Sequence, residues 1–352
     1  MADRIKPARP TIVVAGEEKP VLAERLLRLV VHETRSGLFG CEAVFGNWGS
    51  VGGGVGFLYF DRKLFDFGKA FAIKLDRDTV FEGRITGLDA AFPEGRPPEL
   101  AVLAEDRLQD LRMTRRTRTF ADVSDADVMR ALAADHGLSP SIDVSGPKHK
   151  VLAQVNQSDL AFLRDRARAI DAELWTSGRT LNAKSRSKRA GAALRLKFGR
   201  ELRAFSALSD LAGQRTSVSV SGWDVSSKSA LTHEADESAV MGELGGDASG
   251  VSILKSALGD RKEAVVHGVP LTGEETAARA EAYFKAIARR FVTGHGVAET
   301  DARLRVGASA DLQGLGPLFS GKYYVAEVRH LFDGAQGLRT EFSAERPGVG
   351  RV

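Results

Sequence analysis

The sequence contains a single cysteine, Cys41, among 352 residues, so the chain cannot form an internal disulfide. One free thiol fits folding in a reducing compartment, and free cysteines are usually small buried residues. We therefore expect Cys41 to lie in a core beside Phe45 rather than to act as a nucleophile. No apolar run approaches the ~18–20 residues that a membrane helix needs. The charged N-terminus, Met-Ala-Asp-Arg-Ile-Lys-Pro, lacks the apolar centre of a secretory signal.

The motifs that mark common enzyme and cofactor sites are also missing. No two of the seven histidines have metal-ligand spacing, and the sequence has no His-Glu-x-x-His, Cys-x-x-Cys, phosphate-loop, dinucleotide or Gly-x-Ser-x-Gly motif. Catalytic carboxylate pairs have no fixed spacing, so an Asp/Glu pair of glycosidase type stays open at this point. The motif search therefore indicates no catalytic, cofactor-binding or metal-binding residue.

A group of closely spaced glycines precedes no helix, so we do not expect it to cradle a phosphate. It is typical of a loop, or of a place where another backbone or a neighbouring subunit comes close. The glycines are Gly49, Gly52, Gly53, Gly54 and Gly56.

Basic and acidic residues nearly balance, 50 against 46, but the cations cluster in two places. Residues 179–203 contain nine Lys and Arg against one Glu, and four arginines lie within residues 112–118. Such clusters are compatible with a nucleic-acid backbone, a solvated loop or an acidic partner surface. The first cluster lacks aromatic residues between Arg179 and Lys197, so it has no stacking platform for single strands. The candidate partner-docking residues are Arg112, Arg115, Arg116, Arg118, Arg186, Lys188 and Arg189.

Residues 10 to about 110 have the pattern of β-strands. Apolar or β-branched runs at Thr11–Val14, Cys41–Phe45 and Leu100–Ala104 are bounded by glycines or charged turns. Two alternating arms around a charged turn predict a hairpin over Ile73–Ile85. The run Leu26–Glu33 is either a strand or part of a helix, because strong helix formers precede it. A closed or nearly closed barrel is the expected arrangement, since closure removes exposed strand edges.

Helical patterns follow over residues ~115–200. The sequence Ser124-Asp-Ala-Asp127 resembles a capping box, and we expect its helix to end at Gly137. Ser158 begins a second helix with one apolar stripe. Short strands are expected at Glu173–Trp175 and Arg179–Asn182, which together predict a small α+β insertion.

The last part of the chain returns to strands. Residues 236–263 are rich in Gly, Ser and Ala and weakly patterned, which predicts a long flexible loop. Thr272-Gly-Glu-Glu275 is a capping box before the longest expected helix. The segments Phe319–His330 and Gly337–Arg346 predict a closing hairpin. In its second arm Leu338, Thr340, Phe342 and Ala344 share one face, so the other face is expected to meet water or a partner.

Several local patterns, in order along the chain, resemble one protein family. They are Phe81-Glu-Gly-Arg-Ile85, Ala104-Glu-Asp-Arg-Leu108 with Leu111, Thr119-Phe120, His136-Gly-Leu138, Gln157-Ser-Asp159 with Phe162-Leu163, Gly222-Trp-Asp224 and Gly321-Lys-Tyr-Tyr-Val325 with His330. Together they resemble the phage late control D family, the baseplate hub of contractile tails, which is related to the hub part of VgrG-type spike proteins. The resemblance covers residues 75–346.

This resemblance implies an α+β fold that is mainly β, with two tube-like β-barrel domains and a small α+β insertion between them. We expect residues 1–112 to form the main part of the first barrel and residues 113–200 the insertion. Residues 201–352 would complete the barrels, including the second tube-like domain and the flexible loop 236–263. The chain stops at Val352, so we expect the OB-fold and spike of VgrG-type proteins to belong to a separate partner.

The implied function is structural: a homotrimeric baseplate hub that adapts the hexameric inner tube to a trimeric spike protein and contacts other baseplate components. The protein would belong to a phage tail or a phage-tail-like injection particle assembled in the bacterial cytoplasm. The resemblance implies no enzyme activity, no cofactor and no membrane partner. Two alternatives remain: a tail-tip peptidoglycan hydrolase, and a nucleic-acid-binding protein that uses residues 179–203.

Overall fold

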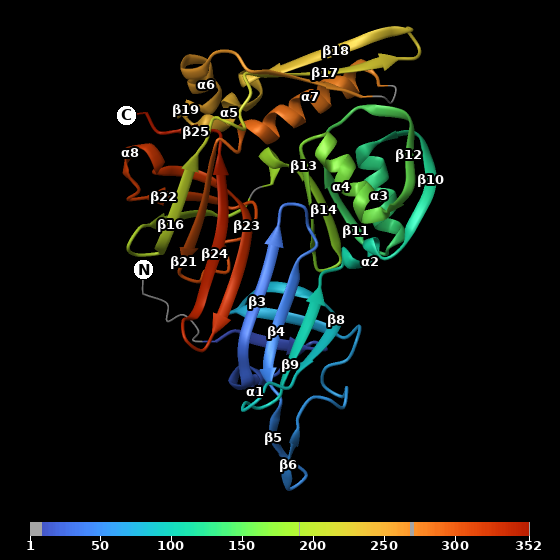
Figure 1. Cartoon of the computed structure of the whole chain (residues 1–352). Helices are drawn as coiled ribbons and strands as arrows, with labels where there is room; N and C mark the ends of the chain where they lie inside the picture. The colour runs from blue at the N-terminus through green and yellow to red at the C-terminus, as the bar shows by residue number, and fades with distance from the viewer. Residues whose placement is uncertain (1–8, 190, 268–270, 352) are drawn as a thin grey trace.

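The computed structural model describes residues 9–189, 191–267 and 271–351. Its main element is a 13-stranded sheet, with a helix-containing unit beside it and a helical cap at one end (Figure 1). The strand order along the sheet is β16-β21-β24-β23-β3-β4-β9-β8-β7-β1-β2, with β22 joining at β23 and β15 pairing with β22. The charged N-terminal residues that we contrasted with a signal peptide lie outside the described residues.

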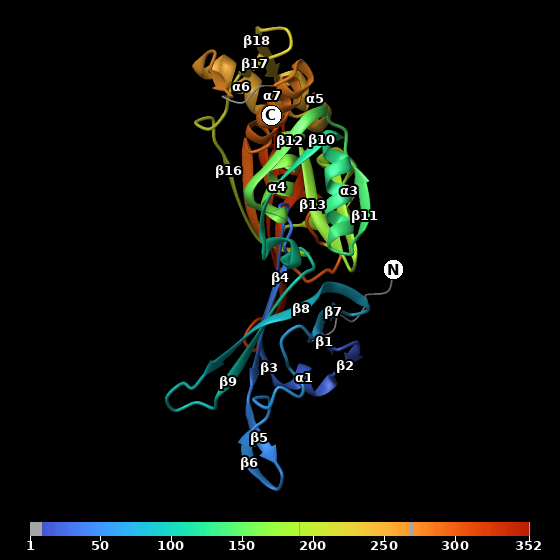
Figure 2. The same cartoon turned by 90° about the vertical axis from the view of Figure 1, so that its right-hand side faces the viewer.

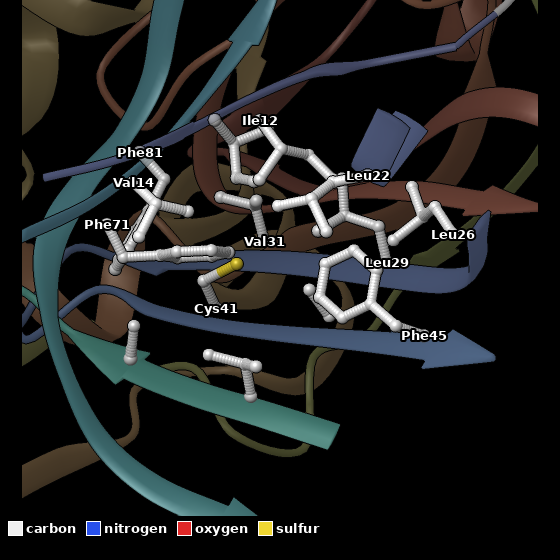
Figure 3. Packing of buried hydrophobic residues seen from close by; sticks show 14 of the residues in the cluster. Ile12, Val14, Leu22, Leu26, Leu29, Val31, Cys41, Phe45, Phe71 and Phe81 are labelled. Carbon is white, nitrogen blue, oxygen red and sulfur yellow. The ribbon is translucent and has the colours of Figure 1, made fainter. Parts of the chain in front are cut away.

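The N-terminal half of the sheet encloses one apolar core, in which Cys41 and Phe45 are buried near Leu29 and Phe71 (Figure 3). Its elements are β1 (Thr11–Val14), β2 (Glu17–Glu18), α1 (Pro20–Arg25), β3 (Leu26–Thr34), β4 (Gly40–Gly46), β7 (Ala70–Leu75), β8 (Asp78–Ala91) and β9 (Glu99–Glu105). The predicted strands and the hairpin over residues 73–85 are confirmed, as is the burial of Cys41.

The ambiguous run Leu26–Glu33 is a strand, and a short helix directly precedes it. Pro20 begins α1, where its fixed φ and missing N–H suit the first helical turn. The chain becomes extended at Leu26, and β3 then carries the β-branched pair Val30 and Val31. The helix-forming residues thus end where the strand begins.

The closely spaced glycines form part of a hairpin rather than a loop. Strand β5 (Trp48–Val51) pairs with β6 (Gly54–Phe57), and this arm projects from the end of the molecule (Figure 2). Gly52 and Gly53 make its turn with φ of +59° and +85°, a region that glycine adopts without steric cost.

The C-terminal half of the sheet curls around a second core. Its elements are β15 (Ala193–Lys197), β16 (Leu202–Ser209), β21 (Val292–Ala298), β22 (Ser309–Gln313), α8 (Gly316–Phe319), β23 (Gly321–Asp333) and β24 (Gly337–Arg346). Strands β23 and β24 are the predicted closing hairpin, and Phe342 and Ala344 lie in this core as their alternation indicated. The short β25 (Gly348–Val349) follows and pairs outside the main sheet.

The predicted α+β, mainly β class is confirmed, but the two β-rich parts form one sheet. One edge of β23 pairs with β24, and its other edge pairs first with β22 and then with β3. Accordingly Val325 and Val328 of β23 lie in the second core, whereas Phe332 lies in the first. The division into three domains at residues 112 and 200 stays a prediction.

The insertion packs its two longer helices, α3 and α4, against two small sheets. Its elements are α2 (Gln109–Arg112), β10 (Arg115–Ser124), α3 (Asp125–Asp135), β11 (Ser139–Asp143), β12 (Lys148–Ser158), α4 (Asp159–Ala169), β13 (Ala172–Ser177), β14 (Thr180–Ser185) and the 3-10 helix η1 (Arg186–Lys188). The predicted capping box is present, because Ser124 and Asp127 bond to each other's backbone N–H. Ser158 caps α4 as predicted.

A helical cap covers the end of the molecule above the insertion (Figure 1). Its elements are β17 (Ser217–Asp224), β18 (Ser229–Asp236), η2 (Glu237–Val240), α5 (Met241–Leu244), β19 (Ala248–Ser249), α6 (Gly250–Leu258), β20 (Lys262–Val266) and α7 (Gly273–Ala288). Thr272 and Glu275 form the predicted capping box of α7, the longest helix of the described chain.

The prediction of a long flexible loop over residues 236–263 is wrong, because this segment forms η2, α5, β19, α6 and part of β20. Its small residues serve helix ends: Ser249 caps α6, and Gly259 ends it with φ of +76°. A Cβ on Gly250 would lie 2.3 Å from Cγ of Phe291, so glycine there permits close packing. The small residues of this segment therefore cap helices and permit close packing, and they do not indicate a flexible loop.

Candidate functional site

The predicted docking cations do not form one patch. Arg112 ends α2, three arginines lie on β10, and Arg186, Lys188 and Arg189 lie in or directly after η1. The part of the chain that the structure describes has no group of three or more His, Cys, Asp or Glu side chains placed to hold a metal. None of the helices described there is long and apolar enough to cross a bilayer.

Two of the β10 arginines are occupied within the chain. Arg118 donates to Asp135 at 2.8 Å, to Asp159 at 3.0 Å and to Gln154 at 3.0 Å, and Arg116 lies 3.6 Å from Asp159. Burial alone would raise the pKa of Asp159, but hydrogen bonds from His136 and Gln154 and the two arginine charges lower it. These arginines therefore tie β10 to the start of α4.

The other two arginines of this cluster are more open to a partner. Arg112 is half-exposed and pairs with Glu105 at 2.7 Å. Arg115 is exposed and has no ion pair with any described residue. Of the four arginines, Arg115 is thus the one whose charge is not paired with a described residue.

Arg186 and Arg189 are buried, so their selection as surface docking residues is wrong. Arg189 pairs with Glu173 at 2.8 Å, its side chain is 6% exposed, and its guanidinium lies 4.2 Å from the ring centre of Trp175. Arg186 pairs with Glu345 and lies over the ring of Tyr324. Arg186 thus joins the insertion to the main sheet, whereas Arg189 pairs within the insertion, where Glu173 also accepts a hydrogen bond from Tyr324 of β23.

The remaining cations of the 179–203 run are dispersed over several elements. Lys188 is half-exposed and pairs with Asp143 at 2.6 Å, Arg195 lies 3.6 Å from Asp311, and Arg203 pairs with Glu299 at 2.6 Å. The run therefore does not present a continuous cationic strip.

The outward face of β24 is not wholly a solvent face. Its last carboxylate, Glu345, is 7% exposed and accepts ion pairs from Arg35 and Arg186. The alternation of the strand placed Glu345 opposite the core correctly, but the insertion covers that face. Two arginines from distant segments thus compensate one buried carboxylate.

A second buried joint connects the insertion to the helical cap. Arg289, which directly follows α7, binds Asp171 of the insertion and Glu243 of α5. Burial alone would lower the pKa of Arg289, but the bonds and charges of the two carboxylates outweigh it and raise the pKa. This guanidinium remains charged and holds the two parts together.

A third joint contains a histidine with two carboxylate partners. His149 of β12 bonds to Asp125 at 3.1 Å and to Glu275 of α7, and Arg166 binds Asp125 at 2.5 Å. Burial alone would lower the pKa of His149, but these carboxylates raise it. The hydrogen bonds also lower the pKa of Asp125 and of Glu275 against the effect of burial. The two carboxylates therefore favour the charged form of the imidazole, against burial and the charge of Arg166.

The Asp106 carboxyl and the Cys41 thiol have raised pKa values, and both have structural roles. Burial raises the pKa of Asp106 to about 6. Its oxygens accept bonds from the backbone N–H groups of Phe39 and Leu108 at 3.0 and 2.9 Å. Burial also raises the pKa of the Cys41 thiol well above its usual range, so the thiol stays protonated.

The projecting arm presents an uncharged apolar surface. Residues 46–60 include no Asp, Glu, Lys or Arg. Trp48, Val51, Val55 and Phe57 are all exposed on the hairpin, and Phe57 packs against exposed Phe92 from the end of β8 with ring centres 6.1 Å apart. Exposed aromatic side chains gathered in this way are typical of interaction sites.

Local pattern did not identify the residues that join the parts. Asp171, Glu173, Glu345 and Arg289 are separated from their ion-pair partners by 16 to 310 positions. No spacing signal links such residues. The alternating pattern around Glu345 and the helical pattern before Arg289 indicated the strand and the helix. They did not indicate the residues with which Glu345 and Arg289 pair.

Replacing Arg189 by alanine should destabilise the protein far more than replacing Lys188. Arg189→Ala leaves Glu173 buried without its guanidinium, and loss of one partner from a buried pair costs about 3–5 kcal/mol. Lys188→Ala removes a half-exposed pair and should cost about 0–1 kcal/mol. Urea unfolding followed by circular dichroism measures both. Similar small losses in the two variants would contradict a buried joint at Arg189.

The joint at His149 should make stability depend on pH. The raised pKa of His149 means that its contribution is complete below the unfolded value of 6.5 and is lost as the pH rises through the folded value. The free energy of unfolding should therefore fall as the pH rises above about 6.5. In His149→Gln this fall should be smaller, whereas exposed His295→Gln should keep it. An unchanged slope in His149→Gln would contradict the charged imidazole.

The structure resembles those of phage tail proteins over almost its whole length. It matches the 43 kDa tail protein of prophage MuSo2 from Shewanella oneidensis with a TM-score of 0.70 and 11% identity, over 96% of this chain and 98% of that one. A tail protein from Neisseria meningitidis matches with a TM-score of 0.70 and 12% identity, over 97% of each chain.

A component of the type VI secretion system of E. coli, which shows structural similarity to the T4 bacteriophage tail proteins gp27 and gp5, matches with a TM-score of 0.62. Its identity is 11%, over 97% of this chain and 79% of that one. The predicted resemblance to tail hub proteins is thus confirmed at the level of the fold.

No curated protein matches the sequence. A protein-family model described as the Alg8 N-terminal domain matches residues 60–333, which is most of the chain. The chain therefore belongs to the Alg8 N-terminal domain family and is built on the fold of phage tail proteins.

Proposed function

We propose that this protein is a structural hub in the baseplate of a contractile phage tail or a phage-tail-like injection particle. The observation that supports this role most strongly is the likeness in fold to tail proteins over 96–97% of the chain. The buried ion pairs support the same role, because the carboxylates and arginines described above hold parts of the chain together. The proposal includes no catalytic step.

The hub works as a homotrimer in this proposal. Each copy contributes two β-rich parts, one around each core, so three copies present six tube-like units to a hexameric inner tube. The opposite end holds a separate trimeric spike protein. Residues 1–112 and 201–352 supply the tube-like domains, residues 113–200 form the insertion, and the particle is assembled in the bacterial cytoplasm.

The β5–β6 arm is the contact between copies that we favour. Its exposed side chains carry no charge, and burial of apolar area is the main driving force of obligate association. A trimer contact is heterologous, so the arm of one copy would pack on a different surface of the next. The projection of the arm away from the body suits such reach (Figure 2).

Sedimentation velocity at micromolar concentration tests the trimer and the arm together. Wild-type protein should sediment as a trimer, and the double variant Trp48→Ser with Phe57→Ser should weaken assembly at least about tenfold, because central aromatic contacts each contribute about 2 kcal/mol or more. Trp223→Ser, which changes an exposed tryptophan on β17, is the control and should remain a trimer. A stable monomeric wild type would refute the trimer.

The docking cations that are not buried are the proposed contacts with other baseplate components. After removal of the buried Arg186 and Arg189, the candidates are Arg112, Arg115, Arg116, Arg118 and Lys188, of which Arg115 has the freest charge. Docking through such cations suits an acidic partner surface.

Charge reversal at Arg115 tests this docking surface. Arg115→Glu breaks no ion pair with a described residue, so the variant should fold and form trimers. It should nevertheless lower the number of complete particles, counted by negative-stain electron microscopy of the producing bacteria. Exposed Lys228→Glu, in the turn between β17 and β18, is the matched control. Normal particle numbers with Arg115→Glu would contradict the assignment.

A further inference from the structure

A cavity of about 730 Å³ lies between the insertion and the helical cap. Its walls come from α4 and β13 on one side and from α7, β17 and β20 on the other, where α4 and α7 are neighbours in Figure 1. This volume is in the range of sites that hold an organic ligand or a short peptide, about 300–1,000 Å³. Its position is distinct from the projecting arm and from Arg115.

The floor of the cavity is apolar and built from small side chains. Ala167 and Ala172 line it from the insertion, and Val220, Val265 and Ala282 line it from the cap. Small side chains leave space close to the backbone of both units. An occupant with small apolar side chains can therefore contact this floor without moving it.

Cations outnumber anions around this floor. The lining arginines are Arg35, Arg164, Arg168, Arg186, Arg279 and Arg289, and the lining carboxylates are Asp165, Asp171 and Glu173. Most of these arginines already have carboxylate partners: Arg289 has two, Arg35 and Arg186 share Glu345, and Arg168 binds Asp165.

Two of the arginines that line the cavity have no carboxylate partner among the described residues. Arg164 of α4 donates only to the carbonyl oxygens of Ser36 and Gly37, at 2.8 and 3.1 Å. Arg279 of α7 has no hydrogen bond or ion pair with any residue that the structure describes. Each belongs to a different wall of the cavity.

These two guanidinium groups are held in an unfavourable environment. Burial, followed by the charge of Arg168, lowers the pKa of Arg164, and burial followed by the charge of Arg166 lowers that of Arg279. Burial and the charge of Arg279 also lower the pKa of His267, which lines the same cavity. A ligand that brings negative charge between the walls would relieve this repulsion.

We propose that the cavity binds an acidic segment of a partner protein, whose carboxylates pair with Arg164 and Arg279 and whose small apolar side chains contact the alanine-rich floor. This inference rests on the proposed hub role, to which it adds the chemistry of one partner. The complementarity of charge identifies the ligand class, because arginine binds carboxylates through paired N–H donors. A single-stranded nucleic acid suits the cavity less well, since Tyr283 is its one aromatic lining residue among those described.

Fluorescence anisotropy with full-length protein tests the proposal. The probe is a labelled peptide of alternating glutamate and alanine, about ten residues long, and binding should weaken as salt screens the pairs. Arg279→Gln and Arg164→Gln should each weaken binding at least about tenfold, whereas Arg168→Gln, at the same cavity but already paired with Asp165, should change it less than about threefold. Circular dichroism establishes that each variant is folded.

Three binding results would overturn the inference. The first two are no peptide binding at about 1 mM protein and equal peptide binding by Arg279→Gln and wild type. The third is Arg279-dependent binding of a thymidine oligonucleotide or of inorganic phosphate without binding of the peptide. A strong loss of thermal stability in Arg279→Gln without peptide would also overturn it, because an unpaired guanidinium should not support the fold. Sedimentation distinguishes this failure from failure of the hub role. A trimer that does not bind the peptide refutes the cavity assignment alone.

Discussion

The shared strand β23 is the constraint on which the rest of the architecture depends. From Tyr324 to Asp333 it pairs with β24 along one edge, while β22 and β3 occupy successive parts of the other edge. A register shift between Val325 and Glu327 separates these parts, so Val328 still faces the second core and Phe332 reaches the first. Backbone hydrogen bonding along β23 therefore fixes the two cores relative to each other.

Buried ion pairs then hold the insertion against this sheet and against the helical cap. Glu345 and Glu173 bind arginines of the segment after β14, and Arg289 and His149 connect the insertion to α5 and α7. A buried ion pair contributes little net stability compared with apolar packing, but removing one partner of the pair strongly lowers the stability of the fold. Such joints favour one relative arrangement of parts. The unpaired Arg164 and Arg279 stand out against this pattern, because most neighbouring arginines have a carboxylate.

Much of the fold was predictable because its signals are local. The capping boxes at Ser124 and Thr272 and the alternation in the closing hairpin each predicted the element that formed. The prediction of a flexible loop over residues 236–263 was wrong because Gly and Ser occur both in loops and at helix ends. Tertiary packing, here of Gly250 on Phe291, distinguishes a helix end from a loop. The glycines around Gly52 indicated a loop or a close approach of another backbone or subunit, whereas they lie in the β5–β6 hairpin.

The sequence by itself determined the mainly β class, the main helices and strands, and the lack of common catalytic and metal-binding motifs, because each depends on residues close together in the chain. The tertiary structure alone decided which charges are free. Arg115, Arg186 and Arg189 look alike in a list of cations, yet the first is exposed and the other two are buried against partners up to 159 positions away. Charge pairing between distant segments requires folded coordinates, since no spacing in the chain encodes it.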